Sequence, residues 1–262
     1  MQARKRFGQH FLEPVWVVKV VEAIGPAPGD TFLEIGPGRG ALTAALAPRV
    51  RRIIAVEIDR DLAAALPAHV PANVQVVTDD VLEVGLDALL AGEPLPLRAA
   101  GNLPYNVASP ILFQLLALAD EGRRLGDATL MLQKEVADRL VARTGTPGYG
   151  ALAIQAQLLA DVDRLLTLPP GAFRPAPKVT SALVRLRFHA PVADVGSGAA
   201  FERVVRGLFR QRRKTLLNAL RPVAASFGRL PDEVLERAGL QPSRRAEALT
   251  VEEMARLTRA ML

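Results

Sequence analysis

Short apolar runs alternate with helix-like segments along the first 190 residues, and this alternation constrains the fold more than any other feature. Seven runs are predicted as strands, at residues 31–35, 52–57, 74–78, 97–100, 128–133, 164–168 and 181–188. Six segments are predicted as helices, at residues 15–24, 41–47, 60–66, 110–119, 135–142 and 151–159. Strands separated by helices form βαβ units, so we expect an α/β fold with a mostly parallel sheet. The last two predicted strands have no helix between them and are expected to form an antiparallel edge pair.

The strand pattern ends at a linker rich in Pro, Gly and Ser, at residues 190–198. After it, apolar residues recur at helical spacing, as in Phe201, Val204, Val205 and Leu208. The sequence therefore predicts a catalytic domain at 1–190 and a small all-α domain at 199–262.

The net positive charge of the chain lies in its last quarter. Residues 201–262 hold 13 Lys and Arg against 7 Asp and Glu, whereas the rest holds 20 of each kind. A neutral body with a basic terminal domain favours a polyanionic partner such as nucleic acid. Arg212, Arg213 and Lys214 form the densest cluster, which we place on the helix that opens this domain. The alternative is that the cluster pairs with acids such as Glu202, Glu233 or Glu236 and holds the helices together.

The composition argues against several classes of protein. The chain has no cysteine and three histidines, which excludes disulfides and thiolate chemistry and makes a metal site unexpected. It has no run of about 18 apolar residues, so no transmembrane helix is expected. Residues 1–7 are charged but precede no long apolar run, so we expect no secretory signal and a cytoplasmic protein, by default a monomer.

A glycine-rich turn follows the predicted strand at residues 31–35, with Gly36, Gly38 and Gly40 spaced G-x-G-x-G. Glycine tolerates positive φ and lets a ligand lie against bare backbone. The spacing differs from the G-x-G-x-x-G of dinucleotide sites, in which a pyrophosphate meets a helix N-terminus. Glu34 precedes the turn, and its carboxylate favours a cationic ligand over a phosphate.

Acidic residues also end the next two predicted strands. Glu57 can hold the two hydroxyls of a ribose, and Asp79 or Asp80 can reach an adenine amino group. Strand-end acids often only cap helices, which is the alternative role for Asp59 and Asp61. Together with the glycine turn, however, these acids describe an adenosine site without a phosphate. S-adenosylmethionine fits such a site, and the sequence therefore predicts a methyltransferase.

The motif Asn102-Leu103-Pro104-Tyr105 comes directly after the predicted strand at 97–100. The Asn102 side chain and the Leu103 carbonyl can accept hydrogen bonds from an exocyclic amino group. Tyr105 can stack on a heterocycle, and Pro104 restrains the backbone between them. An alternative interpretation is a plain helix start, with Ser109 as the N-cap and Pro110 as the first helical residue, but it leaves Asn102 and Tyr105 unexplained. The motif favours a planar, amine-bearing base held at the end of the sheet.

The chain resembles the small-subunit ribosomal RNA adenine N6,N6-dimethyltransferases of the KsgA family. The resemblance rests on matching motifs at residues 7–12, 34–40, 102–105, 133–140, 173–179, 211–216 and 245–250, together with Glu57 and Asp80. It implies a Rossmann-like class I methyltransferase sheet with a small C-terminal helical domain. It also implies S-adenosylmethionine as the cofactor and small-subunit ribosomal RNA, or the assembling small subunit, as the partner.

The resemblance also assigns residues. Together with the glycine turn and the strand-end acids, the resemblance gives a set of expected cofactor contacts. They are His10, Leu12, Glu34, Gly36, Gly38, Glu57, Asp80 and Asn102. The contacts expected with the target base come from Asn102, Leu103, Pro104, Tyr105 and Phe173. In this scheme Tyr105 and Phe173 stack on either side of the base, although Phe173 could instead be a core aromatic. Arg212, Arg213, Lys214 and Lys178 are expected to meet RNA, although Lys178 could be a solvated loop charge.

Two features depart from the family pattern. Position 10 is often asparagine in the family, and the segment ahead of Arg4 is shorter than in many relatives. The alternatives are a large-subunit rRNA adenine methyltransferase of the antibiotic-resistance type, which usually reads Asn-Ile-Pro, and a non-catalytic ribosome-assembly factor. A DNA adenine methyltransferase would need a larger recognition domain, and a small-molecule enzyme would not need the basic one.

Overall fold

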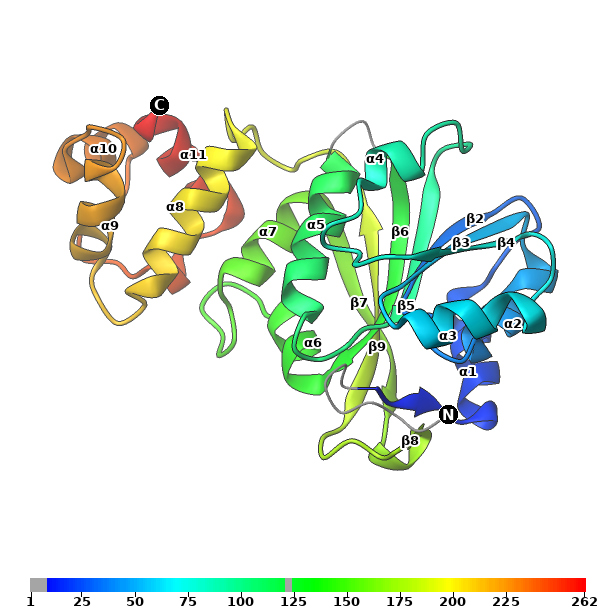
Figure 1. Ribbon diagram of the computed structural model, residues 1–262. Coiled ribbons are helices and arrows are strands. Elements are labelled where there is room, and N and C mark those ends of the chain that lie inside the picture. Colours follow the sequence, from blue (N-terminus) through cyan, green and yellow to red (C-terminus); the bar gives the residue numbers. More distant parts are fainter. Residues whose placement is uncertain (1–8, 121–123) are drawn as a thin grey trace. The chain divides into compact units, whose positions relative to one another are not determined.

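The computed structural model describes residues 9–120 and 124–262 (Figure 1). Its main feature is a seven-stranded sheet in the order β4-β3-β2-β5-β6-β9-β7. The strands are β2 (Thr31–Ile35), β3 (Arg52–Glu57), β4 (Val74–Thr78), β5 (Leu97–Asn102), β6 (Leu125–Gln133), β7 (Ala160–Leu168) and β9 (Ser181–Phe188). Neighbours from β4 to β6 pair in parallel, and β9 pairs antiparallel with β6. The predicted α/β fold is therefore confirmed, with β9 and β7 as neighbours at one edge.

Helices connect the strands and cover the sheet. They are α1 (Pro14–Ile24), α2 (Ala41–Leu46), α3 (Arg60–Ala65), α4 (Leu86–Leu89), α5 (Ala108–Asp120), α6 (Lys134–Leu140) and α7 (Ala151–Leu159). All five residues of β2 are buried, because a central parallel strand is covered on both faces. A core cluster joins α1, α2 and the sheet. No helix in the described residues is long and apolar enough to cross a membrane.

The structure contains short elements that the sequence did not predict. Strands β1 (Phe11–Leu12) and β8 (Phe173–Arg174) pair antiparallel in a separate two-stranded sheet. Two residues are too few to show an alternating pattern, so neither strand left a signal. Helix α5 begins at Ala108, before the predicted start at Pro110. Ser109 is therefore inside the helix and is not its N-cap, contrary to the alternative interpretation of this segment as a plain helix start.

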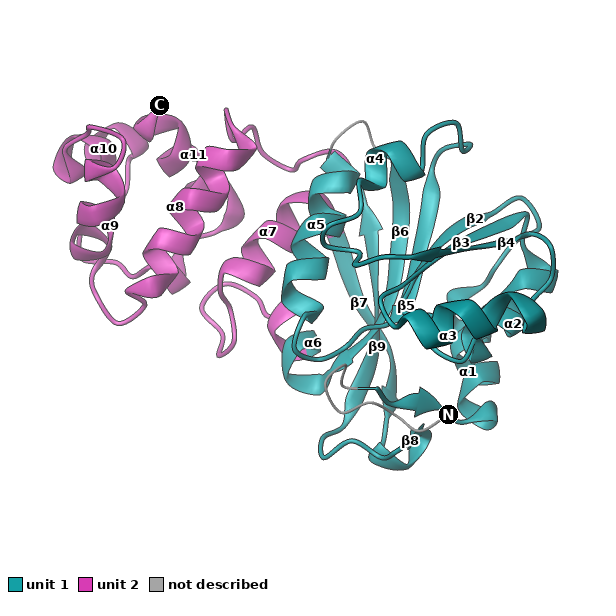
Figure 2. Cartoon of the chain, viewed as in Figure 1, with its two compact units in different colours: residues 1–137, 161–189 teal, residues 138–160, 190–262 magenta. Residues whose placement is uncertain are grey.

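The chain divides into two compact units (Figure 2). Unit 1 comprises residues 1–137 and 161–189, and unit 2 comprises residues 138–160 and 190–262. Unit 2 contains α7 together with α8 (Gly198–Arg210), α9 (Leu216–Ala225), α10 (Pro231–Ala238) and α11 (Val251–Met261). The division after residue 189 agrees with the linker, but segment 138–160 lies in unit 2, whereas the sequence placed it in the first domain.

Segment 138–160 joins unit 2 through specific contacts. Helix α7 packs on α8 and α11. The ring of Tyr149 is fully buried, lies edge-on to Phe209 with 6.4 Å between ring centroids, and its hydroxyl donates to the Leu249 carbonyl at 3.0 Å. Helical periodicity shows that this segment has a buried face, but it does not show which partner buries it.

Candidate active site

A pocket in unit 1 lies at the carboxyl ends of the parallel strands, where α/β sheets commonly bind ligands. It is lined by residues that follow β2, β3, β4 and β5 and by the N-terminal segment around β1. The pocket brings together eleven of the twelve predicted cofactor-site and base-site residues: His10, Leu12, Glu34, Gly36, Gly38, Glu57, Asp80, Asn102, Leu103, Pro104 and Tyr105. Phe173 does not line it.

The glycine turn forms one wall of the pocket. Gly36, Gly38 and Gly40 have φ values of 66°, 59° and 77°, in the left-handed region that disfavours other residues. A Cβ on Gly38 would lie 3.3 Å from the ring of Phe11, which covers the turn. The guanidinium of Arg39 lies 4.1 Å from the centroid of the same ring. The turn therefore presents bare backbone to the pocket and is held there by an aromatic side chain that the sequence did not single out.

Glu57 is buried at the end of β3. Its two carboxylate oxygens accept hydrogen bonds from the backbone amides of Gly38 and Asp59, each at 2.9 Å. Burial raises the pKa of the Glu57 carboxyl, and these two amides oppose that rise. Each carboxylate oxygen has two lone pairs, so both can still accept from a hydroxyl. Glu57 therefore shapes the glycine turn and keeps acceptor capacity for a ribose.

Glu34 is 1% exposed at the pocket wall, and its Oε2 has no hydrogen-bond partner. Burial raises the pKa of this carboxyl to about 7, and the nearby Glu57 carboxylate adds to the rise. A buried carboxylate oxygen without a partner is costly unless a ligand supplies one. Because a cation lowers this cost most, the environment of Glu34 fits a positively charged ligand.

The acids that follow β3 and β4 differ in their contacts. Asp80 follows β4, lines the pocket, and uses one oxygen to accept from the Leu82 amide at 2.9 Å. Asp59 caps α3 by accepting from the Asp61 amide at 3.1 Å, as the capping alternative expected. Asp59 also accepts from the Gln9 side chain at 3.1 Å and so helps to hold the N-terminal segment.

The Asn102–Tyr105 motif continues from β5 into the pocket. The Asn102 Nδ2 donates to the His10 carbonyl at 2.6 Å, which leaves Oδ1 as the acceptor of this amide. The Tyr105 hydroxyl shares a 2.8 Å hydrogen bond with Ser181, the buried first residue of β9. No sequence pattern selects Ser181, because its contact depends on how β9 pairs with β6.

The N-terminal motif is described only from Gln9 onward, and Phe7 and Gly8 lie outside the described residues. His10 stacks on Tyr105, with 5.5 Å between ring centroids and 25° between ring planes. Its Nδ1 lies 2.7 Å from the carbonyl of Pro175. Leu12 pairs with Phe173 across the β1–β8 ladder. The segment therefore crosses the pocket between the glycine turn and Tyr105.

Phe173 corrects the expected base sandwich. Its side chain is 1% exposed and belongs to the core cluster beneath α1, with Val17, Leu168 and Leu183 among its members. The pairing of β8 with β1 fixes it there, so it presents no face to the pocket. The structure favours the alternative in which Phe173 is a core aromatic.

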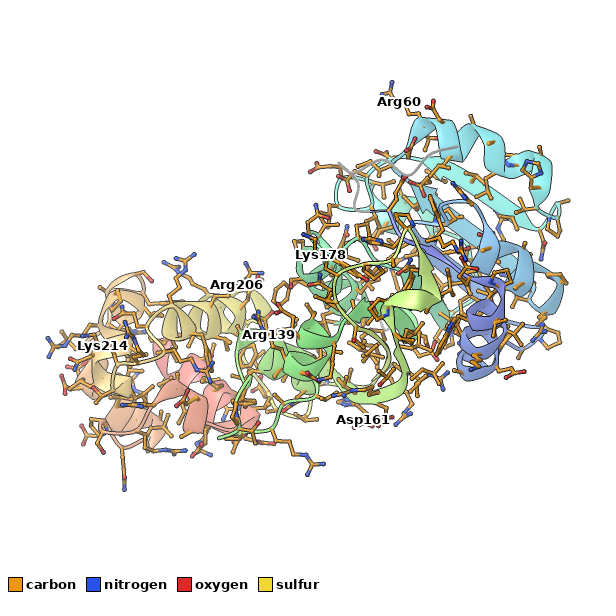
Figure 3. All side chains as sticks on the ribbon, turned by 90° about the horizontal axis from the view of Figure 1, so that it is seen from below. Arg60, Arg139, Asp161, Lys178, Arg206 and Lys214 are labelled. Atoms are coloured by element: carbon orange, nitrogen blue, oxygen red, sulfur yellow. The ribbon has the colours of Figure 1, made fainter. Side chains whose placement is uncertain are left out.

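The basic cluster of unit 2 occupies the turn between α8 and α9 rather than a helix. Arg212 forms an ion pair with Glu247 at 2.7 Å. Glu247 is not among the acids that the sequence suggested as its partners, and one of those, Glu202, pairs with Arg206 instead. Lys214 in unit 2 and Lys178 in unit 1 are exposed (Figure 3). Arg213 is exposed as well. Neither Arg213 nor Lys214 makes an ion pair within the described part of the chain.

A family model described as ribosomal RNA adenine dimethylase matches residues 1–261. The chain belongs to the ribosomal RNA adenine dimethylase family. It is therefore a methyltransferase that acts on adenines of ribosomal RNA, with S-adenosylmethionine as the methyl donor.

Curated relatives align with almost the whole length of this chain. The ribosomal RNA small subunit methyltransferase A of Bordetella petrii is 47% identical and aligns with 100% of this chain and 96% of its own. The protein of the same name from Aromatoleum aromaticum is 44% identical over 98% of this chain and 93% of its own.

Solved structures agree with the fold. A dimethyladenosine transferase from Plasmodium falciparum has a TM-score of 0.77 at 24% identity and covers 95% of this chain and 96% of its own, which supports the fold alone. The 23S rRNA methyltransferase ErmE has a TM-score of 0.63 at 28% identity, with 96% of this chain and 99% of its own covered. The dimethylase fold therefore extends across both units of the chain.

Proposed function

We propose that this protein dimethylates the N6 amino group of adenosines in small-subunit ribosomal RNA during assembly of the small subunit. The observation that carries the proposal is that the Asn102–Tyr105 motif opens into the same pocket as the glycine turn and the three strand-end acids. The proposed base-binding motif and the proposed adenosine site therefore line the same cavity. The relatives at 44% and 47% identity, both named for the small subunit, support this choice of substrate.

The carboxylate oxygens and the bare backbone that line the pocket fit S-adenosylmethionine. The unpartnered Oε2 of Glu34 offers a buried site for a positive group, and the free lone pairs of Glu57 offer acceptors for ribose hydroxyls. Asp80 keeps one carboxylate oxygen for an adenine amino group. Gly36 and Gly38 have positive φ values that disfavour other residues, and without a side chain they leave bare backbone for the cofactor to lie against. We therefore assign these residues, with His10, Leu12 and Asn102 beside them, to the cofactor site.

The reaction needs positioning more than acid–base chemistry. A sulfonium methyl group is already a strong electrophile, whereas the adenine amino nitrogen is a weak nucleophile because its lone pair is delocalised into the ring. Hydrogen bonds from that amino group to Asn102 Oδ1 and to the Leu103 carbonyl favour a pyramidal nitrogen and direct its lone pair. Tyr105 stacks on the base. The proton is lost to water or to a carbonyl after transfer, and the base must be unpaired or flipped out.

The basic residues outside the pocket are proposed to bind RNA phosphates. Arg213 and Lys214 in unit 2 and Lys178 in unit 1 are exposed, so their charges are available to a polyanion. Arg212 is held by Glu247 in an exposed pair that an RNA phosphate could replace. We further propose that the protein acts on assembling small subunits in the cytoplasm, and that it does so as a monomer.

The large-subunit alternative rests on the likeness to ErmE, at 28% identity. Methyl transfer from labelled S-adenosylmethionine separates the candidates when the purified protein is offered unmethylated small subunits, large subunits, genomic DNA or small amines in parallel. We expect label in small-subunit RNA, recovered as N6,N6-dimethyladenosine after digestion. Label in large-subunit RNA alone would overturn the proposal. An Asn102→Ala variant, which lacks the amide acceptor, is expected to lose transfer while keeping its fold.

A further inference from the structure

The ladder of β2 with β5 runs between two halves of the pocket. Most of the residues proposed to hold the cofactor lie at the ends of β2, β3 and β4, which pair with one another, whereas the Asn102–Tyr105 motif continues from β5. The chain continues from β2 to β3 and β4 on one side of this ladder and from β5 to β6 on the other, and α/β sheets bind ligands at such a point. The spacing of β2 and β5 therefore sets the distance between the two halves.

The last pair of this ladder is Ile35 with Gly101. A Cβ on Gly101 would lie 2.5 Å from the backbone carbonyl oxygen of Ile35 and 3.4 Å from the Ile35 Cβ. The φ of Gly101 is not in the left-handed region, so its backbone conformation does not require glycine. The position requires glycine because a backbone oxygen of the neighbouring strand occupies the space that any side chain would take.

The segments that follow this pair are fixed to different strands. The amide of Gly36 donates to the Val56 carbonyl at 2.9 Å and so holds the glycine turn to β3. The amide of Leu103 donates to the Met131 carbonyl at 3.2 Å and so holds the base-binding motif to β6. If β2 and β5 were further apart at their ends, the turn and the motif would each move with their own strands and would separate.

We propose that Gly101 is a positioning residue for methyl transfer, because the absence of a side chain lets β5 end close enough to β2 to bring Asn102 within reach of the methyl donor. This inference rests on the proposed function, in which Asn102 accepts a hydrogen bond from the target amine. A methyl group at Gly101 would push the strand ends apart by roughly 0.5–0.9 Å, the distance that relieves its overlap with the Ile35 carbonyl. A displacement of about 1 Å between reacting groups costs roughly 100-fold in rate.

Gly101→Ala adds this single methyl group, and two other glycines provide matched controls. Gly126→Ala makes the same change in β6, where the new Cβ would lie 3.3 Å from the side chain of Pro96. Gly207→Ala in α8 would place a Cβ 2.4 Å from the side chain of Val223, a contact as close as the one at Gly101. Neither control glycine lines the described pocket.

Each protein is assayed below its own unfolding temperature. Calorimetric titration gives the affinity for S-adenosylmethionine and counts the folded cofactor sites. The rate of a single turnover is then measured per folded site, with saturating cofactor and increasing amounts of unmethylated small subunits. This design separates binding of the two substrates from the transfer step, and it corrects for any fraction of a variant that does not fold.

Gly101→Ala is expected to lose about 10- to 100-fold in its maximal single-turnover rate. Its affinities for S-adenosylmethionine and for small subunits should stay close to those of wild type, because each half of the pocket keeps its own contacts. A loss of rate without a loss of binding is the result of removing a contribution made only in the transition state. Gly126→Ala and Gly207→Ala should transfer the methyl group at the wild-type rate per folded site.

Four outcomes contradict the inference. A wild-type rate in Gly101→Ala would show that the spacing at this pair does not govern transfer. A matched loss of S-adenosylmethionine affinity would assign Gly101 to cofactor binding, and a variant without folded sites would assign it to stability alone. An equal loss of rate in Gly207→Ala would make the effect a general result of a strained methyl group. Failure of the proposed function is distinguishable, because the wild-type protein itself would then not methylate small subunits.

Discussion

The carboxylate of Glu57 at the end of β3 accepts a 2.9 Å hydrogen bond from the backbone amide of Gly38 in the glycine turn. Two parts of the proposed cofactor site that are separate in the sequence are thus joined by a hydrogen bond in the structure. The acid that is expected to hold the ribose also fixes the loop against which the cofactor lies. Substitution of Glu57 should therefore affect binding through both contacts.

Glu57→Ala is expected to weaken S-adenosylmethionine binding by about 1.5–3 kcal/mol, the usual range for hydrogen bonds to a charged group. Calorimetric titration measures this loss, and circular dichroism confirms that the fold is intact. Glu57→Gln is the control, because its single amide oxygen can still accept from one backbone amide, and its loss should be smaller. Unchanged affinity in Glu57→Ala would remove this residue from the site.

Glu34 predicts a pH dependence of stability. Its pKa in the folded protein is about 7, above the ordinary value of 4.5, so between these values the unfolded chain binds fewer protons than the folded one. Stability is therefore expected to fall as pH rises from about 4.5 to 7, by an amount on the order of 3 kcal/mol at most.

Urea denaturation of wild type and Glu34→Gln at several pH values tests this expectation. The amide cannot ionise, so the variant should gain stability relative to wild type as pH rises through this window. Parallel profiles for the two proteins would show that Glu34 does not titrate there.

Tyr105 and Ser181 give a test of the stacking role. Tyr105→Phe keeps the ring and should keep most activity, whereas Tyr105→Ala should lose about 1–3 kcal/mol of stacking on the base. Steady-state kinetics with small subunits measures both. Ser181→Ala removes the partner of the Tyr105 hydroxyl, so combining it with Tyr105→Phe should add little to either single loss. If Tyr105→Phe and Tyr105→Ala were equally inactive, activity would depend on the Tyr105 hydroxyl and not on its ring.

Phe173 should behave as a core residue. Phe173→Ala is expected to cost about 3–5 kcal/mol of unfolding free energy because it leaves a cavity in the cluster under α1. Phe173→Leu should recover most of that stability and should also retain the KM for small subunits. A stable Phe173→Leu protein with a sharply raised KM would return Phe173 to the base site.

The basic cluster predicts a salt dependence. Neutralising Arg212, Arg213 and Lys214 together should flatten the log–log dependence of RNA affinity on salt by roughly 0.7–0.9 per lost phosphate contact. Thermal stability should change little, because the pair of Arg212 with Glu247 is exposed and worth at most about 1 kcal/mol. Arg212→Gln alone isolates the effect of that pair. A loss of stability with an unchanged salt slope would assign the cluster to structure.

Sequence patterns placed most residues of the proposed cofactor site together because these residues lie at or near the ends of strands. Glu34, Glu57, Asp80 and Asn102 come at successive strand ends, and parallel pairing brings those ends to one edge of the sheet. The position of Phe173 could not be predicted in this way, because it depends on a two-residue ladder with no periodicity of its own. The partners of Tyr105 and Arg212 are likewise 76 and 35 residues away and depend on tertiary pairing.

The assignment of 138–160 to unit 2 governs how the protein can be dissected. Unit 2 is made of two stretches of chain with part of unit 1 between them. A truncation at the linker around residue 190 would leave α7 attached to unit 1 with its apolar face and Tyr149 stripped of the helices that bury them. During synthesis the same helix emerges well before α8 and α11, so its burial waits for the last part of the chain. A separable RNA-binding module would have to be excised as two segments and rejoined.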